Sequence, residues 1–407
     1  KPQTPNPKPQ TPNPKPRVEV VDSYFVLSWR ISRHVLFTNT VYQKVQRENA
    51  IDSDFSYWKK TMEMSKIYDV LIVNKVRTEL ISCVWLPFKS INIDTNNSIF
   101  KLLLAKYDSA FGYSLNIVEF SYPSEGKVWD VDEVARDEEG SMSLLSNYKL
   151  GVTQKMKIKD SIKHFASYPL AYNMVLTRGN EGLISLYDTS QPPDRNDGIE
   201  CFDRLLKLEG HSGPGYGLDW NLHKEAVAIS AAFDGTVCVW DVSGASKLDK
   251  ALRPVFNRHF SEGIYDVKWH KKDPNLFCCT TTYGNLFVSD ARQSENSPIV
   301  NSVIRECPKS KIDMNGLDTT KVLVSTHRGA HVYDLRNLNK RVLTMDTHLA
   351  PITQCLWSPH RDYVFATSSV DRHVSVSDMG EVDRYSMNDS SALQQAVIVD
   401  NIYPVQP

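Results

Sequence analysis

Four residues between positions 211 and 240 have the types and the spacing to form a connected set of hydrogen bonds. They are His211, Ser230, Asp234 and Trp240, within the stretch from Leu208 to Asp241. One imidazole nitrogen can bond the carboxylate and the other the hydroxyl, which can also accept the indole N–H. We therefore predict a row across neighbouring strands in which buried polar groups satisfy one another. An isolated hairpin with an incidental histidine is the alternative.

Motifs for catalysis or cofactor binding are absent from the sequence. It contains no GxGxxG after a strand, no GxxxxGK loop, no GxSxG and no HExxH. The eleven histidines fall mostly at repeated positions, where a structural role explains them. We expect no cofactor, no metal site and no enzymatic activity, and we keep an active site in a central channel as a third hypothesis.

Two short strands and a tight turn must hold this row together. Phe233-Asp234-Gly235 predicts a turn, because Gly accepts positive φ and Asp hydrogen-bonds its own backbone. Residues 226–231 and 236–240 are apolar enough to be strands with both faces buried. The Gly-His start at 210–211 and the Trp-Asp end at 240–241 are the signature of one WD-repeat blade.

The ending of this stretch recurs along the chain. An aspartate follows an apolar strand at five places, with spacings of 53, 49, 44 and 44 residues: Asp188, Asp241, Asp290, Asp334 and Asp378. His259 and His348 precede two of these aspartates at about thirty residues' distance. A repeat of this period predicts an all-β protein, a β-propeller.

The polar row becomes less complete outside the first blade. In the last clear blade, His348, Thr367 and Asp371 are kept, but Ser377 replaces the tryptophan. In the blade that ends at Asp290, Tyr283 replaces the turn aspartate. Propellers tolerate such losses because apolar packing between blades supplies most of their stability.

Composition excludes several classes of protein. The chain has 407 residues, 41% of them hydrophobic, and a net charge of −1, which argues against nucleic-acid binding through bulk charge. No run of eighteen apolar residues occurs, so we expect no membrane span. The seven cysteines are an odd number without a CxxC pair, and most lie in apolar strands. They are typical of small core residues in a reducing compartment, the cytosol or the nucleus.

The N-terminal region divides into three segments before the propeller at 76–407. Residues 1–17 are a proline-rich tail that repeats KPQTPNP and cannot bury a core. Residues 18–42 have strand composition and an unclear role. Residues 43–75 predict a helix that packs on the propeller, with Asp52 or Ser53 as its N-cap and an apolar stripe through Trp58, Ile67 and Leu71.

Further strands and one acidic loop follow the predicted helix. The apolar runs at 80–87, 99–107 and 115–123 have the length and composition of strands. Residues 128–140 carry six carboxylates, which predict a solvated acidic loop rather than a metal site.

Several segments resemble those of one WD-repeat family. They are GHSGPGYGLDWN (210–221), YDVKWH (265–270), VYDLRNLNK (332–340), QCLWSPH (354–360), DFSYWKK (54–60), SCVWLP (82–87) and DNIYP (400–404). The family is the retinoblastoma-binding histone chaperones, whose members include the small subunit of chromatin assembly factor and the second subunit of type B histone acetyltransferase. The resemblance covers about residues 50–407, and Tyr57-Trp58-Lys59-Lys60 before the propeller is its distinguishing mark.

The resemblance implies a seven-bladed propeller with an N-terminal α-helix and no catalysis of its own. It implies that a helix of histone four lies between the N-terminal helix and an acidic loop of the last blade. Carried over, this groove would use Tyr57, Trp58, Ile67, Tyr68, Leu71, Glu381 and Asp383. The tail of histone three would sit on an acidic end of the channel, where Tyr216 is kept.

Departures from the family concern the last blade and the acidic rim. Only 29 residues follow Asp378, so residues 76–378 predict six recognisable blades and an incomplete, degenerate seventh. Residues 18–37 are a candidate to fill the gap, since an uncovered sheet edge invites aggregation. Pro214 and Tyr265 stand where the family has Glu, so the fold transfers better than the affinity for histones.

The leading interpretation is a non-catalytic histone-binding scaffold subunit of chromatin assembly, histone acetyltransferase or deacetylase complexes. Its expected partners are histones three and four and other chromatin-complex subunits, with one copy per complex, in the nucleus and also the cytoplasm. Neither direct nucleic-acid binding nor membrane binding is expected. The alternative is a substrate adaptor of a cullin-type ubiquitin ligase, because Asp290-Ala291-Arg292 and Asp334-Leu335-Arg336 resemble the WDxR box of such adaptors. Both arginines could instead pair with acidic groups of a neighbouring blade.

Overall fold

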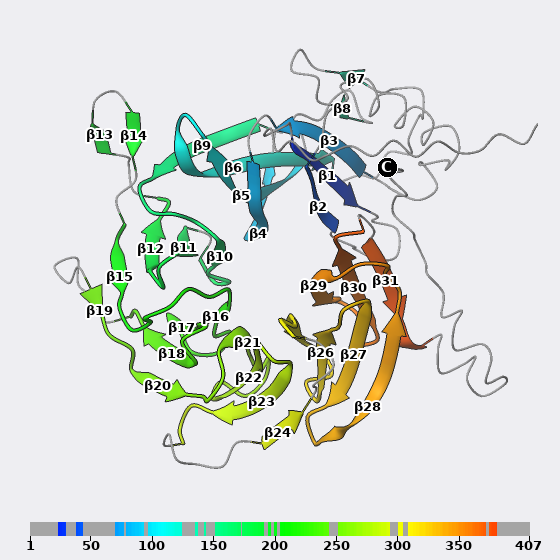
Figure 1. Cartoon of the computed structure of the whole chain (residues 1–407). Helices are drawn as coiled ribbons and strands as arrows, with labels where there is room; N and C mark the ends of the chain where they lie inside the picture. The colour runs from blue at the N-terminus through cyan, green and yellow to red at the C-terminus, as the bar shows by residue number, and fades with distance from the viewer. Residues whose placement is uncertain are drawn as a thin grey trace, which may run out of the picture.

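Strands make up nearly all of the regular structure in the computed structural model. It describes residues 23–29, 38–43, 70–76, 79–92, 97–123, 135–136, 142–143, 151–171, 173–190, 194–196, 199–201, 204–243, 251–293, 300–303, 308–371 and 374–380. Six of the sheets stand around a central axis as the blades of a β-propeller, and Figure 1 looks along that axis. The all-β propeller predicted from the aspartate repeat is confirmed.

The first two blades have the most strands. The first contains β4 (Glu79–Asn92), β5 (Asn97–Asp108), β6 (Gly112–Pro123), β9 (Gly151–Ile158), β14 (Ile199–Cys201) and β13 (Asp194–Asn196). The second contains β10 (His164–Ser167), β11 (Met174–Arg178), β12 (Ile184–Asp188), β15 (Leu206–Leu208) and β19 (Ala251–Leu252). The three apolar runs predicted as strands between positions 80 and 123 therefore lie in β4, β5 and β6.

The other four blades follow one plan, from an inner strand to an outer one. The third contains β16 (Leu218–Trp220), β17 (Val227–Ala231), β18 (Thr236–Asp241) and β20 (Phe256–His259). The fourth contains β21 (Ile264–Trp269), β22 (Leu276–Thr281), β23 (Asn285–Asp290) and β24 (Val300–Val303). The fifth contains β25 (Ile312–Met314), β26 (Lys321–Ser325), β27 (Gly329–Asp334) and β28 (Asn337–Asp346). The sixth contains β29 (Ile352–Trp357), β30 (Val364–Ser369) and β31 (Val374–Asp378).

The repeated aspartates mark one position in the blade plan. Asp188, Asp241, Asp290, Asp334 and Asp378 are the last residues of β12, β18, β23, β27 and β31, the third strand of each blade from the second to the sixth. The tight turn predicted at Asp234 joins β17 to β18, and Gly235 in it has a φ of 81°. This left-handed conformation is open to Gly at no steric cost.

Apolar side chains from neighbouring blades form shared cores. Ile229 and Val237 of the third blade pack with Val267, Trp269 and Phe277 of the fourth in one buried cluster. A second cluster joins the second and third blades, and Trp240 is fully buried in it. Because each core belongs to two blades, burial of apolar surface holds adjacent blades together.

Inner strands are also joined by a repeated carboxylate bond. Asp219 of β16 accepts the backbone N–H of Trp269 in the next inner strand at 2.9 Å. Asp313 of β25 accepts that of Trp357 at 2.8 Å. Asp266 of β21 accepts that of Ile312 at 3.3 Å.

A second link joins the same blades at the far end of the inner strands. The Asn221 amide donates to the carbonyl of Pro274 at 2.9 Å, and the Asn315 amide donates to that of Asp362 at 2.6 Å. His270 takes the same role with Nε2, 2.8 Å from the carbonyl of Thr319. We call this end, with the loops after the inner strands, the loop end. The opposite end, with the turns between second and third strands, is the turn end.

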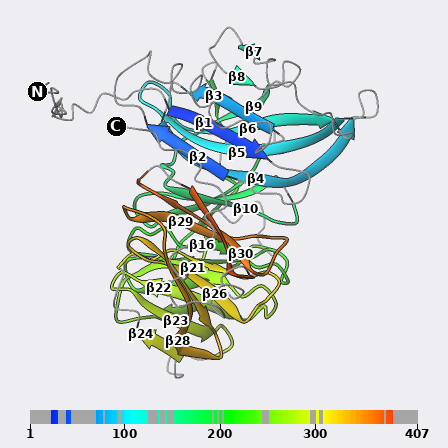
Figure 2. The ribbon, with the colours of Figure 1, turned by 90° about the vertical axis from the view of Figure 1, so that its right-hand side faces the viewer.

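A further sheet contains the strands nearest the N-terminus. It is formed by β2 (Thr38–Gln43), β1 (Ser23–Trp29), β3 (Val70–Val76), β8 (Met142–Ser143) and β7 (Ala135–Arg136), in that order. Figures 1 and 2 show β1 to β3 beside the first blade, and Figure 1 shows them between that blade and the sixth. Segment 18–42, predicted to be strand-like, thus contributes β1 and most of β2.

The helix predicted over residues 43–75 is wrong at its C-terminal end. Val70–Val76 is strand β3, and its register pairs Leu71 with Ser28 and Val73 with Val26. The β-branched residues Val70, Ile72, Val73 and Val76 favour a strand, and pairing with β1 outweighs the helical spacing of the apolar stripe. Gln43, the first residue of the predicted helix, is the last residue of strand β2. Residues 44–69 lie outside the described residues, as does most of the acidic segment 128–140.

Two other expectations concern cysteines and membranes. Cys238, Cys278, Cys279 and Cys355 are free and buried in blade strands, as small core residues would be. Within the described ranges, no helix has the length and apolar character that crossing a bilayer requires.

Deleting residues 1–40 should lower the melting temperature of the protein by several degrees. The deletion removes β1, which pairs with both β2 and β3, so it leaves a strand edge uncovered. Differential scanning calorimetry would measure the change, with a deletion of residues 1–16 as the control that keeps every described strand. Equal melting temperatures for the two deletions would contradict a role for β1 in closing the ring.

Candidate functional site

The structure brings the four residues of the predicted polar row together in the third blade. Trp240 Nε1 donates to Ser230 Oγ at 2.8 Å, and Ser230 Oγ lies 2.7 Å from His211 Nε2. His211 Nδ1 is 2.7 Å from Thr236 Oγ1, which donates to Asp234 at 2.6 Å. One assignment fits all these bonds: His211 carries its proton on Nδ1 and accepts from Ser230.

Thr236 is the member of the row that the sequence analysis missed. We expected the imidazole to bond the carboxylate directly, but Nδ1 lies 3.7 Å from the Asp234 oxygen and the threonine hydroxyl stands between them. A threonine two residues after a turn aspartate can donate its hydroxyl to that carboxylate. This spacing was the sequence signal that could have identified Thr236. Asp234 also accepts the backbone N–H of Ser212 at 2.7 Å, which ties the preceding connection to the turn.

Other blades keep shortened forms of the row. In the sixth blade, His348 Nε2 lies 2.8 Å from Thr367 Oγ1 and Nδ1 lies 3.1 Å from Asp371. In the second blade, Asp160 accepts the hydroxyls of Ser185 at 2.9 Å and Tyr187 at 3.0 Å. The recurring arrangement supports a structural role for these polar groups.

The sequence pattern assigned His259 to the blade that ends at Asp290, the fourth, and this assignment is wrong. His259 is exposed at the end of β20 in the third blade, where it pairs with Thr236 in the strand register. Its neighbour Arg258 is buried instead and donates to Ser289 at 2.7 Å. Ser289 stands where the third blade has Trp240. Alternation along β20 turns Arg258 inward and His259 outward.

Burial and hydrogen bonding shift the ionisation of the row. Although burial opposes its charge, Asp234 has a pKa well below its ordinary value because His211, Thr236 and the backbone of Ser212 stabilise the carboxylate. Burial lowers the pKa of His211 below 6.5, against the opposing effect of Asp234. Burial also lowers the pKa of His164, with the nearby Lys311, Lys268 and Arg178 adding to the effect.

An aromatic trio stands at the turn end beside the axis. Tyr216, the predicted channel-face residue, is 37% exposed and its ring lies 5.7 Å from that of Phe233 and 5.5 Å from that of Tyr265. Phe233 and Tyr265 are stacked at 6.0 Å. The ammonium of Lys311 lies 5.6 Å from the ring centre of Tyr216 and 5.2 Å from that of Tyr265, so it contacts both rings as a cation.

The two arginines of the adaptor hypothesis are paired within their own blades. Arg292 Nε donates to Asp290 at 3.0 Å and Arg336 Nε donates to Asp334 at 2.9 Å, each to the carboxylate two residues earlier. The expected pairing with a neighbouring blade is therefore wrong, because this short spacing lets the guanidinium fold back onto the strand end. Their side chains are 64% and 74% exposed, so these pairs add little stability.

Most of the predicted histone-helix groove cannot be located. Tyr57, Trp58, Ile67, Tyr68, Glu381 and Asp383 lie outside the described residues. Leu71 is in β3, so it is not on a helical face as predicted. In the described ranges, no cluster of three or more His, Cys, Asp or Glu side chains could hold a metal ion.

Comparison with known proteins gives two findings. The family model described as "WD domain, G-beta repeat" matches residues 202–241, which span β15 to β18, and 339–378, which end with β31. The chain is also similar to the protein named histone acetyltransferase type B subunit 2 from Candida glabrata. The two are 24% identical over 344 residues, which cover 84% of this chain and 78% of that protein. The family resemblance drawn from the sequence is confirmed by this relative.

Replacing Ser230 with Ala should destabilise the third blade. The indole N–H of Trp240 would lose its acceptor inside a fully buried site, which costs about 1–3 kcal/mol of unfolding free energy. Ser243→Ala is a matched control, since that hydroxyl bonds only an exposed strand end at Asp241. Denaturant unfolding of both variants would measure the difference, and equal losses would contradict the role of the row.

Stability should fall as pH drops below 6.5, the ordinary histidine value. His211 and His164 have pKa values lowered in the folded state, so the unfolded chain binds protons that the folded chain rejects. Their contribution is complete above this pH and is lost below it. His164→Gln should flatten this part of the profile in urea titrations, compared with the unsubstituted chain. The same slope in both proteins would show that other groups cause it.

Proposed function

We propose that this chain is a histone-binding scaffold subunit of a chromatin assembly, histone acetyltransferase or histone deacetylase complex, without catalysis of its own. The observation that carries the proposal is the similarity over 84% of the chain to a protein named as subunit 2 of a type B histone acetyltransferase. A propeller offers rigid surfaces for protein partners. Its His211, Ser230 and Asp234 are bonded within an interior row, which favours a structural use of these groups.

The partners follow from the same relative. A chain in the position of that subunit would associate with a catalytic acetyltransferase subunit and present histones to it, as one copy in a hetero-complex. Such a complex would act on histones, so the nucleus is the proposed compartment, together with the cytoplasm.

We propose that the sheet of β1, β2, β3, β7 and β8 takes the seventh place in the ring. Its position between the first and sixth blades in Figure 1 supports this proposal. A ring closed in this way would draw most of its last blade from β1, β2 and β3, which precede the first blade in the sequence.

The proposed site for histone four is the groove that would be formed by Tyr57, Trp58, Ile67 and Tyr68 with Glu381 and Asp383. Leu71 is left out because it belongs to β3. The aromatic and aliphatic side chains would bury the apolar face of the histone helix. The histone-three tail would bind more weakly, because Pro214 and Tyr265 supply no carboxylate at the turn end.

A histone-four helix peptide should bind the full chain with little dependence on salt. Apolar contacts are not screened, whereas a rim of charges would make association strongly salt-dependent. Fluorescence anisotropy at low and physiological salt would test this, with a histone-three tail peptide as the comparison. A tight histone-three interaction with a steep salt dependence would contradict the proposal.

Substitution of a groove residue should weaken the binding of the histone-four peptide, whereas substitution of an exposed residue elsewhere should not. Tyr68→Asp should weaken the histone-four peptide by about tenfold or more. Tyr283→Asp is the control, since Tyr283 is 69% exposed on the fourth blade. Equal affinities for the two variants would remove the groove from the proposal. The immobilised chain should also capture core histones from nuclear extract. A failure to capture them would overturn the proposed function itself.

A further inference from the structure

The turn end of the propeller carries positive charge around an aromatic centre. Its inner connections and turns present the exposed cations Lys163, Lys309 and Arg328. Lys163 immediately precedes β10, Lys309 is in the connection before β25, and Arg328 is in the turn from β26 to β27. Backbone hydrogen bonds show that the connections before inner strands lie beside the ends of second strands. The N–H of Lys163 donates to the carbonyl of Arg178 at the end of β11, and the N–H of His348 donates to that of Arg328.

Two further cations lie at the centre of this surface. Lys311 contacts the rings of Tyr216 and Tyr265 and is largely buried. Arg178 is fully buried under the Gly215–Gly217 loop, and its Nη1 donates to the carbonyl of Gly217 at 3.3 Å. Among the described residues, its Nε and Nη2 atoms have no hydrogen-bond partner. A buried cation with unused donors adds a field that is little screened by solvent.

Three carboxylates of the same region, Asp234, Glu262 and Asp266, are already engaged. Asp234 belongs to the polar row, and Glu262 accepts both of its bonds from the Asn285 amide at 2.8 Å. Asp266 accepts the N–H of Ile312 and lies 3.6 Å from Lys311. Exposed carboxylates at this end include Glu181 in a turn and Asp346 at the end of the outermost strand of the fifth blade.

We propose that this surface, formed by the aromatic trio with Lys163, Lys309, Lys311 and Arg328, is a docking site for an acidic segment of a partner protein. The cations would pair with carboxylates of the segment, and the exposed part of Tyr216 would receive an apolar or aromatic side chain. The site shares no residue with the proposed histone groove and prefers the opposite charge to that of a histone tail.

A protein partner is favoured over a nucleic acid by the geometry of the trio. Its rings pack against one another at 5.5 to 6.0 Å, and Lys311 covers two of them, so free ring faces for stacked bases are few. The chain as a whole has a net charge of −1, which gives little of the general attraction for phosphates on which nucleic-acid binding relies.

The test uses the full chain and three labelled probes. They are a short peptide of alternating Glu and Ser with one central Phe, its counterpart with Lys for Glu, and a single-stranded oligonucleotide. By anisotropy, the acidic peptide should bind about tenfold or more tighter than the basic one and weaken as salt rises. Equal or tighter binding of the basic peptide, or binding of the oligonucleotide alone, would overturn the proposal.

A charge-reversed variant locates the site. Combined Lys163→Glu, Lys309→Glu and Arg328→Glu should reduce acidic-peptide affinity by about tenfold or more. Combined Lys224→Glu, Lys272→Glu and Lys340→Glu changes the net charge equally on exposed residues away from the turn end and should leave affinity nearly unchanged. Equal losses in both would refute the location. A histone-four peptide should bind all three proteins alike, so this result is independent of the proposed function.

Discussion

The described part of the ring depends on a bond that three inner strands repeat, in which an aspartate carboxylate accepts a backbone N–H of the next inner strand. Asp219, Asp266 and Asp313 repeat this bond through the third, fourth and fifth blades. The bond fixes the position of each blade along the propeller axis relative to the next blade. The apolar faces of the two blades can then interdigitate. Lys268 and Lys311 then neutralise two of these carboxylates. Asp219 and Asp266 therefore serve the contacts between blades and are not free to bind a cationic ligand.

Much of the fold follows from short-range patterns in the sequence. The aspartate at the end of each third strand and the turn at Asp234 could be located because they depend on local backbone geometry. The helical interpretation of Val70–Val76 failed because β1, more than forty residues away, pairs with this segment. Thr236 and Arg258 were missed for a related reason: their partners are chosen by packing across strands, and spacing along the chain does not reveal that choice.

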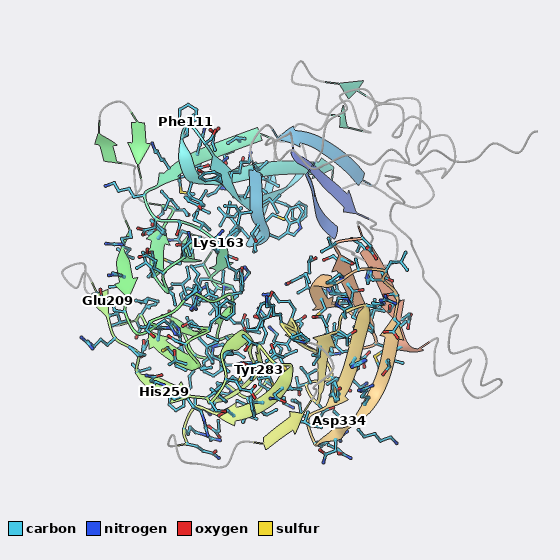
Figure 3. The ribbon with its side chains drawn as sticks, in the orientation of Figure 1. Phe111, Lys163, Glu209, His259, Tyr283 and Asp334 are labelled. Carbon is cyan, nitrogen blue, oxygen red and sulfur yellow. The ribbon has the colours of Figure 1, made fainter. Side chains whose placement is uncertain are left out.

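The polar groups of the molecule fall into two sets with different uses. Buried groups such as Ser230 and Asp234 satisfy one another and hold blades in shape. Exposed groups at the turn end take no part in these interior rows. Lys163, labelled in Figure 3, is one of them. A change of charge on that surface leaves the interior rows untouched. Substitutions at the turn end can therefore change which partners bind while the propeller is kept.

The links between blades also set an order of assembly. The backbone bonds of the inner strands and those made by Asn221, His270 and Asn315 join residues 44 to 53 positions apart. Each added blade therefore closes a loop of similar length at a similar entropic cost, and growth can proceed from one neighbour to the next. If the sheet of β1 to β3 closes the ring as proposed, it would join the sixth blade across most of the sequence. Contacts of such separation form slowly, so this closure would be the slowest step of folding.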